Sequence, residues 1–92
     1  MKRLGLNIDH IATLRNARGE HHPDPFYAAK FVNKIGVDSI TIHLREDRRH
    51  IKDLDAKKIC SIKNLLTNLE ISIKDEIVKN ALKIKPNFIC IV

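Results

Sequence analysis

Residues 39–51, SITIHLREDRRHI, combine the pattern of a strand with side chains that can move protons and bind anions. Apolar residues recur at every second position, at Ile40, Ile42 and Leu44, while His43 and Arg45 occupy the alternate face. An imidazole titrates near neutral pH, and a guanidinium fork matches the oxygens of a phosphate. The stretch therefore indicates acid–base chemistry beside an anionic group.

Each of these residues also has a purely structural explanation. His43 could be a histidine whose hydrogen bonds are satisfied within the fold, and Arg45 could form a salt bridge with Glu46 or Asp47. The adjacent Arg48 and Arg49 point apart, so we expect at least one of them to be solvated or at a subunit contact. The pattern leaves these alternatives open.

Polar groups that could take part in chemistry also accompany the first and the third apolar runs. Asn7, Asp9 and His10 follow the first run, where Asp9 could orient a hydroxyl or a histidine, or serve only in a turn. Glu70 stands in the middle of the third run, and partial desolvation there would raise its pKa and let it give and take protons. Its structural alternative is an internal ion pair, for example with Arg45.

The basic segment between the first two runs holds further candidates. Arg15 and Arg18 lie where a cation could fold over a phosphate, and the residue pattern does not separate them. His21 and His22 could suggest a metal, but neither an H-x₃-H spacing nor a cysteine pair accompanies them, so we expect no metal site.

The elements that must position these residues follow from periodicity and from breakers. Asp24 and Asp53 are expected helix caps, Pro25 a first helical residue and Gly36 a helix stop. We expect strands at 3–9, 39–44, 68–73 and 87–92, helices at 25–35, 53–66 and 75–84, and a loop over 10–24.

This alternation predicts an α/β fold with a parallel sheet and helical crossovers. The first three strands are apolar on one face only, although a parallel strand covered on both faces is normally apolar throughout. An open sheet with one wet face fits this pattern, and so does a barrel with a partly polar interior. In a (β/α)₈ barrel, polar residues at the carboxyl ends of strands are typical of an active site.

Length favours part of a larger fold. A (β/α)₈ barrel needs about 250 residues, whereas the chain has 92. We therefore expect residues 1–92 to be a single partial domain, the N-terminal βα units of a barrel whose remainder lies beyond Val92. The apolar ending NFICIV would otherwise leave an exposed strand edge, and the piece alone is expected to be inactive.

Composition narrows the function classes. A net charge of +6 favours an anionic partner. One Tyr, three Phe and no Trp, however, supply few aromatic rings on which the bases of a nucleic acid could stack. No apolar run is long enough for a membrane span. Without a signal peptide, and with Cys60 and Cys90 expected as buried free thiols, a cytoplasmic location is expected.

Three stretches together resemble the pyridoxine 5′-phosphate synthase family: LGLNIDHIATLRNARG at 4–19, ITIHLREDRRHI at 40–51 and NLEISI at 68–73. The resemblance covers essentially the whole chain. It implies a (β/α)₈ barrel that condenses 3-amino-2-oxopropyl phosphate with 1-deoxy-D-xylulose 5-phosphate and releases phosphate and water. It also implies no metal or organic cofactor and a homo-octamer.

The resemblance further implies roles for individual residues and places another catalytic histidine and glycine-rich phosphate loops after Val92. A non-catalytic barrel that binds a sugar phosphate, or an inactive fragment of the synthase, is the alternative. The implied acid–base catalysts are His43 and Glu70; the implied ligands of the amino-ketone phosphate are Asn7 and Arg18; those of the deoxyxylulose phosphate are Asp9, His10, Arg45 and His50.

Overall fold

Four parallel strands form one sheet in the order β1-β2-β3-β4 in the computed structural model, which describes residues 1–92. Two helices connect the first pair of strands, and one helix connects each later pair. The elements are β1 (Gly5–Asn7), α1 (Asp9–Arg18), α2 (Pro25–Lys34), β2 (Ser39–His43), α3 (Asp53–Cys60), β3 (Leu66–Ile71), α4 (Asp75–Ile84) and β4 (Phe88–Ile91).

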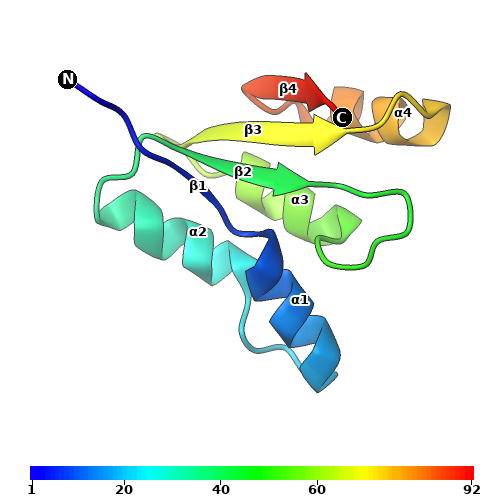
Figure 1. Ribbon diagram of the computed structural model, residues 1–92, viewed down its shortest axis with the longest axis horizontal. Helices are drawn as coiled ribbons and strands as arrows, with labels where there is room; N and C mark the ends of the chain where they lie inside the picture. The colour runs from blue at the N-terminus through cyan, green and yellow to red at the C-terminus, as the bar shows by residue number, and fades with distance from the viewer.

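The helices lie on one face of this sheet and leave the other face bare. Parallel crossovers are right-handed, so a sheet whose strands follow chain order carries all its connecting helices on the same side. Figure 1 shows this arrangement, with β2, β3 and β4 pointing the same way and no helix drawn over the front of the sheet. The expected α/β fold is confirmed, and its one-sided winding is compatible with part of a barrel.

The core fills the space between the helices and the covered face. Every second residue of β2 and β3 points into it and is fully or nearly fully buried, whereas the residues between them are only partly buried. The expected apolar alternation is thereby confirmed for these two strands. The large, fully or nearly fully buried side chains of β2, β3 and the loop that follows β2 are Ile40, Ile42, Leu44, Ile51, Thr67, Leu69 and Ile71.

The covered side of β4 departs from this pattern. Ile89 and Ile91 stand opposite Leu69 and Ile71 in the parallel register and so share the helix-facing side. They are nevertheless 47% and 57% exposed, because no helix within the chain covers β4.

The prediction of a loop over residues 10–24 is wrong for its first half, which forms α1. Polar and basic composition concealed the helix, although Ala and Arg are strong helix formers. Ala12 is fully buried, and Gly19 ends the helix in the left-handed conformation, with φ 67°. Figure 1 shows α1 extending away from the sheet from the end of β1.

The predicted helix at 53–66 and strand at 68–73 are wrong in their bounds. α3 ends at Cys60, and a turn with Asn64 at φ 64° leads directly into β3 at Leu66. Two adjacent leucines had the spacing of a helix face, but Leu66 pairs with Ser39 in the sheet. Ile73, expected on the apolar face, lies past β3 and is 76% exposed.

Other boundary signals agree with the structure in part. The helix over Asp75–Ile84 has the predicted bounds, and the Asp24 carboxylate accepts a hydrogen bond from the Phe26 N–H as the expected cap. Asp53 is not a cap, because it is the first residue of α3. Cys60 is partly buried, which raises its pKa to about 11, whereas Cys90 is exposed, contrary to the expectation.

No helix has both the length and the hydropathy required to cross a membrane.

Replacing Ile42 with alanine should lower the free energy of unfolding by about 2–5 kcal/mol, because a buried Ile→Ala change loses apolar burial and leaves a cavity. Urea denaturation measures this loss. Ile73→Ala, at an exposed position, should change it by less than about 0.5 kcal/mol. Equal losses for the two variants would contradict the described packing.

Candidate active site

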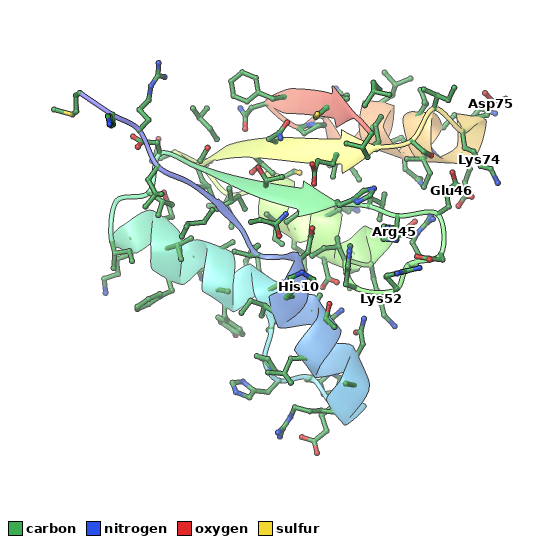
Figure 2. All side chains as sticks on the ribbon, in the orientation of Figure 1. His10, Arg45, Glu46, Lys52, Lys74 and Asp75 are labelled. Carbon is green, nitrogen blue, oxygen red and sulfur yellow. The ribbon has the colours of Figure 1, made fainter.

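The carboxyl ends of the strands gather polar side chains on the bare face of the sheet. His43, the last residue of β2, stands directly opposite Glu70 of β3 in the parallel register. Neighbouring strands lie about 4.8 Å apart, so the two side chains emerge next to each other on the same face. Figure 2 shows His10, Arg45, Glu46 and Lys74 at the same end of the sheet, toward which the strands point.

Asp9 connects the ends of β1 and β2. β1 is only three residues long, and the Asp9 carboxylate supplies the acceptor for the His43 backbone N–H, with an Oδ1–N distance of 2.7 Å. Its Oδ2 accepts from the Asn7 side-chain amide at 3.0 Å, while Asn7 Oδ1 accepts from the Asp9 N–H at 2.8 Å. Asp9 is 6% exposed, so this group fixes both Asn7 and the backbone of His43.

Three histidines meet above Asp9. The ring of His50 lies 6.1 Å from that of His43 and 6.3 Å from that of His10, centroid to centroid. His10 is exposed at the start of α1, His43 is partly buried, and His50 is buried. Residues from α1, β2 and the following loop are thus brought together, as the sequence predicted for a site at the strand ends.

His50 is held as a neutral ring. Its Nδ1 accepts a hydrogen bond from the Ile51 N–H at 2.8 Å, so the ring proton of the neutral form is on Nε2. Burial lowers the pKa of His50, and the positive charges of His43, Arg45 and His10 lower it further, while Asp9 opposes them. At neutral pH the ring can therefore donate a hydrogen bond through Nε2.

Arg45 lines a hollow of about 510 Å³ beyond the end of β2. Its Nε binds Asp47 at 3.2 Å, and its two terminal amino groups have no protein partner. Asp47 is also bound by Arg49, and these cations hold the pKa of Asp47 well below its usual range. The terminal amino groups of Arg45 are therefore free to bind an anion. The hollow is lined by His43, Arg45, Glu46, Asp47, Ser72 and Val92.

The two neighbouring arginines of the loop have different roles. Arg49 is 62% exposed, as expected for at least one of the pair. Arg48 takes a left-handed backbone conformation, with φ 51°, and its guanidinium donates to the carbonyls of Arg45 and Glu46 and binds acidic residues at the starts of α3 and α4. Arg48 therefore shapes the loop that carries Arg45.

Glu70 has no ion pair within the chain. Its carboxylate forms no salt bridge and no side-chain hydrogen bond, and the suggested partner, Arg45, binds Asp47 instead. In the register it stands between His43 on one side and Cys90 on the other. A partly buried carboxylate beside an imidazole is able to exchange protons with a bound molecule.

Arg18 is the one predicted site residue that the structure does not bring to this cluster. It ends α1, about 14 Å along the helix axis from Asp9 at 1.5 Å per residue, and its guanidinium contacts Glu20 at 3.4 Å. No three His, Cys, Asp or Glu side chains are grouped so as to hold a metal ion.

Sequence reasoning missed the residues that hold the backbone on either side of His50. Arg15 contacts both Asn16 and Asp55, and these two residues contact the backbone around His50. The sequence showed Arg15 only as a loop cation equivalent to Arg18. Its partner Asp55 lies 40 residues away, and no local signal links the two.

Comparisons with known proteins place this arrangement in context. Residues 4–92 match the family model described as pyridoxal phosphate biosynthesis protein PdxJ. The chain is 67% identical over 92 residues to the pyridoxine 5′-phosphate synthase of Pelagibacter ubique, covering 100% of this chain and 38% of that protein. It is 54% identical over 89 residues to the synthase of Photobacterium profundum, covering 97% of this chain and 37% of that protein. The chain thus spans less than two fifths of the length of these relatives.

The lowered pKa of His50 should make stability depend on pH. The unfolded chain, in which His50 has its ordinary pKa of 6.5, binds the proton more readily than the folded chain. The contribution of the neutral His50 ring to the free energy of unfolding is therefore complete above pH 6.5. It is lost as the pH falls from 6.5 through the folded-state pKa. Denaturation at several pH values, with an NMR titration of the imidazole, measures both quantities.

His50→Gln should remove this part of the pH dependence, and His22→Ala, at an exposed histidine, should retain it. A His50 that titrates at or above pH 6.5 would contradict its described burial.

Proposed function

The chain belongs to the pyridoxal phosphate biosynthesis PdxJ family, and on this premise we propose that it forms the first four strands of a pyridoxine 5′-phosphate synthase. The reaction proposed is the condensation of 3-amino-2-oxopropyl phosphate with 1-deoxy-D-xylulose 5-phosphate. The observation that supports it most is the pairing of His43 with Glu70 on the bare face, beside Arg45 and His50.

We propose that this bare face is the interior of a (β/α)₈ barrel. Helices cover only the opposite face, and β1 and β4 each have one unpaired edge at which further strands can add. Ile89 and Ile91 extend the apolar, helix-facing side without a helix over them. Further βα units, supplied by a polypeptide of the relatives' length, would cover them and close the barrel.

The proposed reaction requires repeated proton transfer. Imine formation, loss of phosphate, dehydration and ring closure each move a proton on or off carbon, nitrogen or oxygen. His43 supplies an imidazole, the side chain that most often serves as a general acid and base in such steps. Glu70, next to it and without an internal partner, can give or take a proton at a neighbouring atom of the same substrate. No step requires a metal or an organic cofactor.

The proposed binding groups surround this pair. The free fork of Arg45 and the Nε2–H of His50 suit the phosphate of the deoxyxylulose substrate, with Asp9 and His10 nearby for its hydroxyl groups. Asn7 is the proposed ligand of the amino-ketone substrate. Arg18 would bind the phosphate of that substrate only if the far end of α1 folded over the strand ends. A cytoplasmic homo-octamer is the assembly proposed for the complete enzyme.

His43→Ala and Glu70→Gln should each lower kcat by about 10²–10⁴-fold in the complete protein, because each removes a group that transfers protons. Formation of pyridoxine 5′-phosphate from the two substrates measures this. Binding of deoxyxylulose phosphate, measured by calorimetry, should change far less.

The matched controls are His22→Ala and Asp38→Asn, an exposed histidine and an exposed carboxylate at the amino end of β2, opposite the site. A sugar-phosphate-binding protein without catalysis is the alternative. It predicts tight binding with no product from the wild-type protein, and that result would contradict the synthase proposal.

The complete polypeptide should have an intact mass about two to three times 10.6 kDa, because the chain covers 38% of its relative from Pelagibacter ubique. Mass spectrometry of the protein purified from its native source measures this. A mass near 10.6 kDa would show that the remaining βα units, if present, belong to a separate polypeptide.

A further inference from the structure

A buried ion pair joins α1 to α3 directly beneath the histidine cluster. The Arg15 fork contacts both oxygens of Asp55, with Nη1–Oδ1 2.7 Å and Nη2–Oδ2 2.9 Å. The two side chains are 12% and 11% exposed. A bidentate arginine–carboxylate pair has a fixed geometry, so it sets the position of α1 relative to α3 at this point.

The same residues hold the backbone on both sides of His50. The Asn16 amide donates to the His50 carbonyl at 3.0 Å and to the Arg49 carbonyl at 3.2 Å. On the other side, Asp55 Oδ2 accepts from the Lys52 N–H at 2.8 Å. Arg15 also donates through Nε to Asn16 Oδ1 at 3.1 Å, which orients the Asn16 amide.

The orientation of the His50 ring follows from this backbone. Its Nδ1 binds the N–H of the next residue, Ile51, so the ring is tied to the peptide that lies between the two anchored positions. When that peptide is fixed, the ring is fixed with it, and its centroid lies 6.3 Å from that of His10 and 6.1 Å from that of His43.

We propose that Arg15, Asn16 and Asp55 are positioning residues that hold His50 in its substrate-binding orientation, an inference that rests on the proposed synthase function. They act through His50 and do not touch the substrate. The terminal amino groups of Arg15 contact Asp55 and are therefore not free to bind a substrate anion themselves.

Asn16→Ala tests this without unpairing a buried charge, and Arg15→Lys keeps the charge but loses the fork. In the complete protein, each should raise KM for deoxyxylulose phosphate about tenfold while kcat changes less than about threefold. Each should also move the NMR titration of His50 up toward 6.5, its ordinary pKa, as the ring becomes hydrated.

A double-mutant cycle distinguishes an effect of Asn16 through His50 from a purely structural role of Asn16. If Asn16 acts through His50, then Asn16→Ala should add little to the KM of a His50→Gln variant. Asn33→Ala and Arg3→Lys, whose side chains make no hydrogen bond or ion pair with the site, serve as matched controls.

Additive effects of Asn16→Ala and His50→Gln on KM, or an unchanged His50 titration in Asn16→Ala, would overturn the inference. The titration does not depend on activity. If the wild-type protein makes no product, the synthase proposal fails, whereas the shift of the His50 titration still decides whether these residues position the ring.

Discussion

The one-sided winding of the sheet is the constraint from which the site follows. Each strand pairs with its predecessor along the chain, and right-handed crossovers then place every connecting helix over the same face. One face becomes a dry core, and the other remains available for polar groups. Parallel strands also end at a common edge, so the residues that follow β1, β2 and β3 meet there although they are far apart in sequence. A chain with the same elements wound on both faces would bury this polar row.

Specific hydrogen bonds and ion pairs then fix the geometry of the polar groups at this edge of the sheet. Asp9 substitutes for the missing continuation of β1 by accepting the His43 N–H. The loop after β2 is held from outside by Arg48 and from inside by Arg15 with Asp55. The groups proposed to contact substrate therefore rest on buried or multiply bonded neighbours, which is the arrangement expected where geometry must be maintained between turnovers.

Periodicity and breakers predicted the α/β class and a polar sheet face that carries His43 and Glu70, because alternation along a strand determines its two faces. They failed where tertiary contacts decide the structure. α1 is polar enough to resemble a loop, and its stability depends partly on Arg15 reaching Asp55, a contact with no local signature. Leu66 had the spacing of a helix face, but it pairs with Ser39 as the first residue of β3. The support of His50 was missed for the same reason as α1, since both depend on one long-range ion pair.

A crystal structure of the complete protein with 1-deoxy-D-xylulose 5-phosphate bound tests the central claim most directly. We expect the phosphate to contact the Arg45 guanidinium and His50 Nε2, and the carbon chain to lie over His43 and Glu70 on the bare face of the sheet. A sugar phosphate bound on the helix-covered side, or in the hollow beside Lys52 and Lys58, would contradict the assignment of the bare face as the site of the reaction.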